Sequence, residues 1–171
     1  MTTTAPSPVQ DFLQEMHREA ASTRRLLEAV PADRLEWKPH PKSMSIGLLA
    51  RHIAGIPGTF VEMLAHDSFD FGQRSGPPEP SSKDEILEVH DAGQAAIDAA
   101  WGAWTAADLG RTWRVLRGGV ELMAVPRGAV LRNFVCNHLV HHRGQLTVYL
   151  RLLDVPLPSV YGPTADENPF G

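Results

Sequence analysis

The stretch Asn137-His-Leu-Val-His-His142-Arg-Gly-Gln145 decides the fold of this chain. It lies between Pro126 and Pro156, and because proline breaks helix interiors, residues 127 to about 154 are predicted to form one long helix. Successive helical residues advance by about 100°, so His138 and His142 lie about 40° apart on one face, one turn from each other. Two imidazoles at this spacing can converge on one metal ion.

These two histidines lie on the apolar side of the predicted helix. The same arc carries aliphatic and aromatic residues, namely Leu131, Val135, Leu146, Tyr149 and Leu153. Both imidazoles are therefore expected to point into the protein interior. His141 lies about 60° from His138 and about 100° from His142, at the edge of this arc, and is the weaker ligand candidate.

Three further segments have helical patterns. Apolar residues recur at helical spacing over residues 9–30, 45–64 and 82–104. A serine at the start of the second segment and another at the start of the third are candidate N-caps. Pro57 lies inside the second segment and predicts a kink there.

Four helices of this length predict an all-α protein, an antiparallel four-helix bundle that forms a single domain over residues 1–171. Residues 1–8 and 165–171 are expected to be tails. The stretch 69–80 is rich in Gly, Pro and Ser and is expected to be a loop. Residues 112–123 alternate weakly around two glycines, which predicts a short irregular or hairpin-like excursion between the third and fourth helices.

The composition is that of an ordinary globular protein. Hydrophobic residues make up 43% of the chain, the net charge is −4 and no basic block occurs, which argues against a nucleic-acid partner. The single cysteine excludes a disulfide framework and a cysteine-rich zinc module. Neither a signal peptide nor an apolar run of about 18–20 residues is found, so we expect a cytoplasmic protein with no membrane partner.

A third metal ligand is expected from the second helix. His52 shares a helical face with Leu48, Leu49 and Ile56, so its imidazole also points toward the interior. The other histidines outside the fourth helix fit a metal site less well because they lie beside charged residues or in loops: His17, His40, His66 and His90. A histidine on an apolar face is more often a hydrogen-bonded core residue than a ligand. A bundle whose histidines form only core hydrogen bonds is therefore the alternative to a metal site.

Two blocks of the sequence resemble the DinB family of bacterial metal-binding four-helix proteins. His138-Leu-Val-His-His142-Arg-Gly-Gln, followed by Val155-Pro-Leu-Pro-Ser-Val-Tyr-Gly-Pro163, is similar to the family's C-terminal signature. The stretch from Leu35-Glu-Trp-Lys-Pro to His52 is similar to the start of the family's second helix. The resemblance covers about residues 10–165. It implies a metal bound by His52, His138 and His142, the same three residues that the helical pattern selects.

The resemblance also implies a homodimer and a divalent metal ion, most often nickel or zinc. Characterised members of the family include thiol-dependent transferases and isomerases that use a low-molecular-weight bacterial thiol. The leading hypothesis is therefore a metal-dependent enzyme, a thiol S-transferase or a hydrolase, whose catalytic residues the sequence does not identify. The alternative is a non-catalytic metal- or ligand-binding stress-response protein on the same bundle.

Several residues near the two histidines of the fourth helix have predicted roles. Gln145 faces the same interior, where it can hydrogen-bond a ligand or support the bundle, and Tyr149 is expected to be a core aromatic beside a possible pocket. Arg143 faces away and is expected at the surface or in a dimer interface. Cys136 is interpreted as a packing residue, and Gly144 as a position that permits close helix approach.

Overall fold

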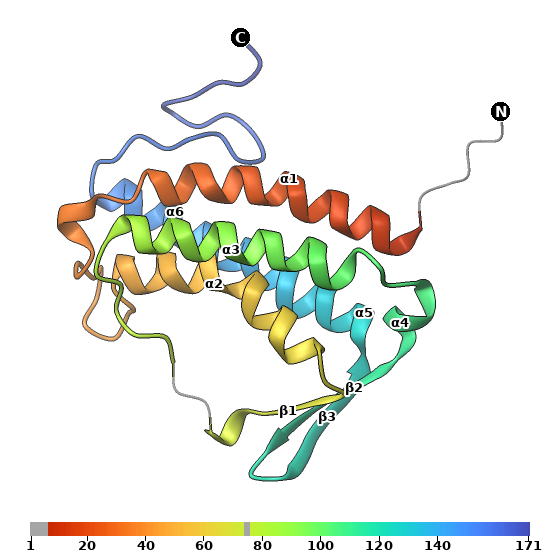
Figure 1. The fold of residues 1–171 in the computed structure, drawn as a ribbon. Helices are drawn as coiled ribbons and strands as arrows, with labels where there is room; N and C mark the ends of the chain where they lie inside the picture. Colours follow the sequence, from red (N-terminus) through yellow and green to blue (C-terminus); the bar gives the residue numbers. More distant parts are fainter. Residues whose placement is uncertain (1–6, 74–75) are drawn as a thin grey trace, which may run out of the picture.

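The computed structural model describes residues 7–73 and 76–171. Four long helices dominate the part of the chain that it describes (Figure 1). The first three are α1 (Pro8–Glu28), α2 (Ile46–Leu64) and α3 (Lys83–Trp101). The fourth is continuous but is divided into α5 (Arg127–Val130), the π-helical segment η3 (Leu131–Asn137) and α6 (His138–Leu152).

The long helices begin where the sequence predicts. The predicted N-cap of α2 is confirmed, because the Ser45 hydroxyl accepts a hydrogen bond of 3.0 Å from the Leu48 amide. The hydroxyl of Ser82 accepts one of 3.1 Å from the Glu85 amide at the start of α3. Pro57 lies inside α2, and Figure 1 shows that this helix changes direction midway along its length, as the proline predicts.

The bundle is not a simple up-and-down array, and this corrects the antiparallel prediction. Contacts between α2 and α3 advance together along both helices, from the Arg51–Glu85 ion pair to the close approach of Gly58 and Gly93. These two helices therefore run in the same direction, as Figure 1 also shows. The reason is the long connection between them, which returns the chain to the starting end of the bundle before α3 begins.

The first helix and the fourth also run in the same direction as each other. Glu15 pairs with Arg132, and further along both helices Thr23 accepts a hydrogen bond from Arg143. The fold is thus two pairs of parallel helices, with the pairs opposed: His17 in the middle of α1 pairs with Asp98 near the end of α3, whereas Arg24 further along α1 pairs with Asp91, earlier on α3.

A three-stranded sheet lies at one end of the bundle, so the prediction of an all-α protein is wrong in this respect. Strands β2 (Thr112–Arg117) and β3 (Val120–Pro126) form an antiparallel hairpin, which confirms the predicted hairpin-like excursion. Its turn uses Gly118 and Gly119, whose φ angles of 58° and 79° suit glycine. The unpredicted strand β1 (Ser68–Asp70) pairs with β2 in parallel.

The sheet is attached to the bundle through its inner face. Trp113 on β2 is buried, and its indole N–H donates a hydrogen bond of 3.1 Å to the carbonyl of Met63 near the end of α2. Short elements complete the fold: η1 (Ala32–Arg34), η2 (Phe71–Gln73) and α4 (Ala106–Gly110). Among the described residues, no helix has the length and apolar character that crossing a membrane requires.

The chain after α6 packs back onto α1, and Figure 1 shows it passing alongside that helix. Glu167 binds the guanidinium of Arg25 at 2.6 Å and accepts the Ser159 amide at 2.7 Å. Asp166 pairs with Arg151 at the end of α6. Residues in the stretch expected to be a C-terminal tail thus hold the last segment against two helices.

Candidate metal centre

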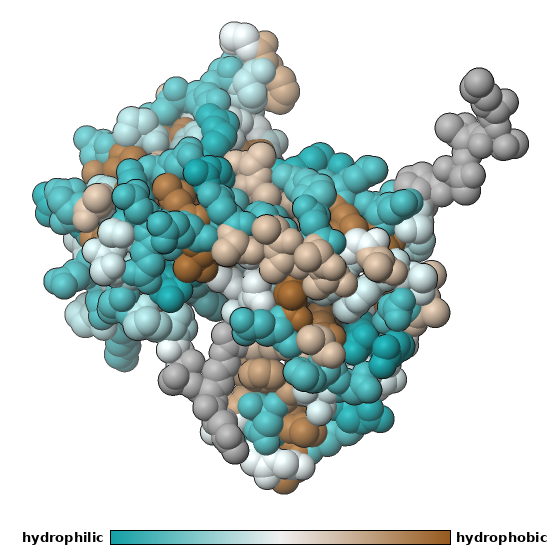
Figure 2. Space-filling view, in the orientation of Figure 1, coloured by the Kyte–Doolittle hydropathy of each residue, from teal (hydrophilic) through white to brown (hydrophobic). Residues whose placement is uncertain are grey.

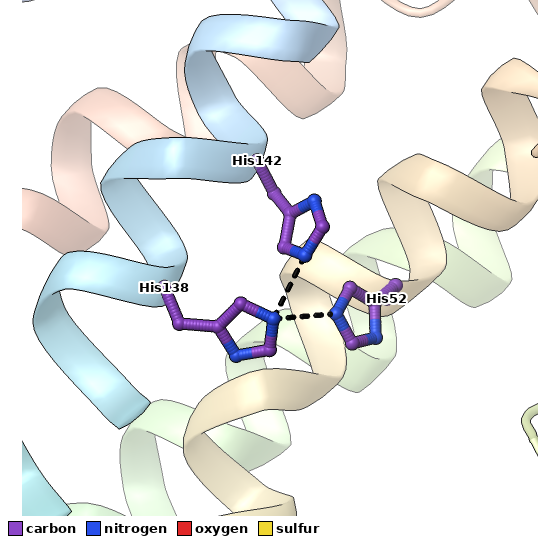
Figure 3. A group of neighbouring side chains, drawn as sticks. All are labelled: His52, His138 and His142. Atoms are coloured by element: carbon purple, nitrogen blue, oxygen red, sulfur yellow. Dashed lines mark hydrogen bonds between the residues drawn. The ribbon is translucent and has the colours of Figure 1, made fainter. Parts of the chain in front are cut away.

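Three half-buried histidines from two helices point toward one another (Figure 3). His52 comes from α2, His138 is the first residue of α6, and His142 follows one turn later. The Nε2 atom of His138 is 3.3 Å from Nε2 of His52 and 2.8 Å from Nε2 of His142. The ligand atoms of the three residues all lie within 4.8 Å of one another, so they form a group that could hold a metal ion.

The remaining ring nitrogens of the two α6 histidines face hydrogen-bond acceptors. Nδ1 of His142 is 2.7 Å from the side-chain oxygen of Gln145. The ring of His138 donates a hydrogen bond to the backbone carbonyl of Phe134, one turn earlier. Because both partners are acceptors, both outer nitrogens carry the proton, and each neutral ring presents an unprotonated Nε2 to the centre.

This arrangement suits a cation. Two imidazole lone pairs 2.8 Å apart repel each other unless a proton or a metal ion lies between them. Two nitrogens bound to the same zinc ion at about 2.0–2.1 Å in tetrahedral geometry are about 3.3 Å apart, which is the distance between His52 and His138. The outer hydrogen bonds are of the type that fixes the tautomer of metal-binding histidines.

Burial keeps these imidazoles neutral. It is the largest cause that lowers the pKa of His138 below its usual 6.5, and the neighbouring imidazole of His142 lowers it further. Burial likewise lowers the pKa of His142, against the opposing hydrogen bond to Gln145. Both rings are thus neutral at physiological pH, the form in which imidazole binds a metal.

The structure places the two predicted pocket residues differently. Gln145 supports His142 directly, as described above. Tyr149 packs edge-on against Trp37 with a centroid distance of 5.8 Å and lies against the hydrophobic core, as predicted for a core aromatic. Neither residue is among the described residues that line the cavity beside the three histidines.

The histidines that the sequence set aside fall into two groups. His141 is exposed on the outer side of α6, and His17 is exposed and paired with Asp98. The placement of His90 on a solvated, charged face is wrong: this residue is 3% exposed, and its Nδ1 lies 3.1 Å from Asp91. Its face of α3 is covered by neighbouring helices, although charged residues flank it in sequence.

Arg143 is also placed wrongly by the sequence. It is 2% exposed rather than at a surface. Its guanidinium donates hydrogen bonds to Glu19 and Thr23 on α1 and to the hydroxyl oxygen of Tyr161 in the C-terminal segment. The C-terminal segment and α1 cover the side of α6 that faces away from the three histidines, so the helix is buried on two sides. The carboxylate of Glu19 compensates the charge of the buried Arg143.

Cys136 is a packing residue, as predicted. Its thiol lies 3.6 Å from the sulfur of Met16. Burial, and after it the charge of Glu15, raises the pKa of this thiol to about 11. The thiol is therefore protonated and unreactive at neutral pH.

A cavity of about 800 Å³ opens beside the three histidines. Its wall includes His52 and His138, and it continues along α2 toward the sheet. A cavity of this size is within the range of small-molecule sites. Of the charged side chains that the structure describes in its wall, Arg51 is paired with Glu85 on α3, and Glu62 is exposed.

Comparisons with known proteins agree on one family. The family model described as the DinB family matches residues 1–168. The uncharacterized protein YrdA of Bacillus subtilis (strain 168) is 28% identical over 158 residues, which cover 91% of this chain and 89% of YrdA. A crystal structure of a DinB-like protein from Bacillus cereus ATCC 10987 aligns with a TM-score of 0.65 at 25% identity, over 88% of this chain and 95% of that one.

A second solved structure has the same fold. The DinB-like protein YjoA from Bacillus subtilis aligns with a TM-score of 0.65 over 88% of this chain and 97% of YjoA, at 20% identity. The overall fold is therefore shared with solved DinB-like proteins.

Proposed function

This chain belongs to the DinB family, and from that premise we propose that it binds one divalent metal ion through His52, His138 and His142. The observation that carries the proposal is the convergence of three Nε2 atoms, those of His142 and His52 lying 2.8 and 3.3 Å from that of His138, with Gln145 and the carbonyl of Phe134 as hydrogen-bond partners of the α6 histidines. Imidazole ligands suit both nickel and zinc, the two metals that the family resemblance suggests.

A metal ion held by three histidines keeps at least one coordination position open, and there it can bind a thiol sulfur or polarise a water molecule. The protein's own contribution is to hold three imidazoles in place. Gln145 fixes the ring of His142, and the carbonyl of Phe134 fixes the ring of His138. The adjacent cavity admits a small molecule to the open side.

We propose further that the protein is a metal-dependent enzyme acting on a small molecule, with a low-molecular-weight thiol as substrate or co-substrate. A thiol S-transferase and a hydrolase both fit an open three-histidine centre beside a cavity. The proposal includes a homodimer in the cytoplasm, as the family resemblance suggests. A non-catalytic metal-binding protein would have the same centre but no turnover.

Metal content and turnover test these proposals in order. The metal content is measured by elemental analysis on protein purified without a histidine tag, which would itself bind metal. The metal-loaded protein is then assayed for transfer of small thiols to electrophiles and for hydrolysis. Metal binding with turnover that His142→Ala abolishes and His141→Ala retains supports the enzyme. Metal binding without turnover favours the non-catalytic alternative.

A further inference from the structure

The cavity beside the three histidines is long enough to hold more than a metal-bound group. It starts at His52 and His138 and extends along α2 to Met63 and to Phe71 beyond β1. A small thiol such as ethanethiol would occupy only the end of this space. The residues that line the rest of the cavity therefore indicate the chemistry of the remainder of the ligand.

The wall away from the histidines is mainly apolar. Small residues from the two parallel helices line one side, where the backbones of Gly58 on α2 and Gly93 on α3 approach closely. Larger hydrophobic side chains line the remainder: Ile56, Phe60, Met63, Phe71 and Val89. Figure 2 shows a band of moderately hydrophobic residues along α3 and strongly hydrophobic ones just below it, toward the sheet.

The charged residues that the structure describes in the wall of this cavity are Arg51 and Glu62. The Nε of Arg51 is 3.2 Å from a carboxylate oxygen of Glu85, so an acidic partner already balances its charge. Glu62 is exposed. A ligand with many hydroxyl groups would lose its hydration against the apolar wall without regaining hydrogen bonds there, which is unfavourable. A hydrocarbon group would gain free energy from leaving water.

We propose that this cavity binds the hydrocarbon part of a small-molecule ligand whose sulfur or other metal-binding group lies at the three histidines. The ligand class is a thiol or thioether with an alkyl or aryl chain. This inference rests on the proposed metal-dependent function for the position of the head group. The contacts with the ligand's hydrocarbon chain depend only on the apolar wall of the cavity.

A series of unbranched thiols tests the two parts separately. Binding of ethanethiol, butanethiol and hexanethiol is measured by calorimetry on zinc-loaded and on metal-free protein. A methylene group that is fully buried increases affinity about fourfold, and a half-buried one about twofold. We therefore expect hexanethiol to bind at least about tenfold more tightly than ethanethiol in both forms. Zinc should strengthen the binding of every member by a similar factor.

Two substitutions on α3 provide a matched pair. Ala96 lines the cavity, whereas Ala99, three residues later, is exposed and is not among the described lining residues. Ala96→Phe should fill the space and abolish the dependence on chain length while it leaves ethanethiol binding and zinc content unchanged. Ala99→Phe adds the same side chain outside the cavity and should retain the wild-type dependence.

The possible outcomes are distinct. Equal affinities for the three thiols in wild-type protein would overturn the inference, whether or not zinc binds. A chain-length dependence that Ala96→Phe does not change would place the hydrocarbon elsewhere and would also overturn it. A change in oligomeric state caused by Ala96→Phe, seen by light scattering, would identify the cavity wall as a protein interface instead. If zinc does not strengthen thiol binding but the dependence on chain length remains, the proposed metal-dependent function is refuted and the apolar site is supported.

Discussion

Two of the three clustered histidines are oriented by acceptors on their own helix. Gln145 lies three residues after His142 and fixes its Nδ1. Its position could be predicted from the sequence because α6 is a regular helix from His138 to Leu152. The carbonyl of Phe134 could not be predicted as the partner of His138, since it belongs to the π-helical turn, which no residue pattern in this chain indicates.

The lowered pKa values of His138 and His142 predict how stability depends on pH. Their folded-state pKa values lie below the unfolded value of about 6.5, so the unfolded chain takes up protons first as the pH falls. Stability is therefore complete above about pH 6.5 and is lost on acidification below it. A bound metal strengthens this dependence because protons compete with it for the same nitrogens.

The melting temperature between about pH 5.5 and 8, with and without a chelator, measures this effect. We expect the chelator to lower the melting temperature strongly above about pH 7 and only slightly near pH 5.5. A chelator effect that is equal at every pH, or absent, would contradict a metal held by neutral histidines.

Arg143 shows why a helical projection alone mispredicts some residues. Projection places it opposite the histidines, and it does lie on that side, but Tyr161 and α1 cover that side. The C-terminal segment that contains Tyr161 begins directly after α6 in the sequence. Its path back over the helices nevertheless depends on ion pairs such as Arg25–Glu167. Such long-range pairs cannot be identified from one sequence.

Replacing Arg143 by methionine should lower the free energy of unfolding by about 3 kcal/mol, because Glu19 loses its buried partner. Arg132→Met is the control. Its ion pair with Glu15 is half exposed on the arginine side, so its loss should cost about 1 kcal/mol or less. Urea unfolding of both variants measures the difference. Equal effects would contradict the assigned burial of Arg143.

At the scale of elements, proline positions predicted the long helices well. They failed for β1, which has only three residues and pairs with residues of β2 about 46 positions later in the chain. They also gave no information on the direction of α3. The predicted close helix approach at Gly144 is not found in the protomer, since an added Cβ there would meet no described atom within 4 Å.

Two glycines of α2 are expected to respond in opposite ways to alanine. A Cβ on Gly47 would lie 2.9 Å from the carbonyl oxygen of Leu35, so Gly47→Ala should lower the free energy of unfolding by about 1–3 kcal/mol. Among the described residues, a Cβ on Gly55 would have a methyl group of Val89 as its neighbour, at 3.8 Å. Gly55→Ala should therefore raise stability by up to about 1 kcal/mol through helix propensity. Thermal unfolding of the two variants decides this, and destabilisation by both would contradict the packing of α2.

At the scale of the whole molecule, the exposed side of α6 is the candidate dimer surface. Val140, Val148 and Leu152 are 38%, 57% and 61% exposed on it, and exposed apolar patches of this kind often mark interfaces. Cys136 packs against Met16 in the protomer core and does not contribute to this surface.

Light scattering at micromolar concentration should therefore give the mass of a dimer. A double substitution, Val148→Glu with Leu152→Glu, should convert it to a monomer by burying charge at the interface. Val120→Glu is a control, because Val120 is 64% exposed on the hairpin, away from α6. A clean monomer for the wild-type protein would contradict the proposed dimer.

Three histidines, and not a fourth neighbour, are expected to hold the metal. Metal-free protein without a tag is titrated with zinc and with nickel at about pH 7.5, where free histidine is neutral. We expect about one ion per chain, with tight binding lost in His52→Ala, His138→Ala and His142→Ala. His141→Ala should bind like the wild type, because His141 is exposed outside the cluster. Binding that survives His142→Ala but is lost in His141→Ala would contradict the account.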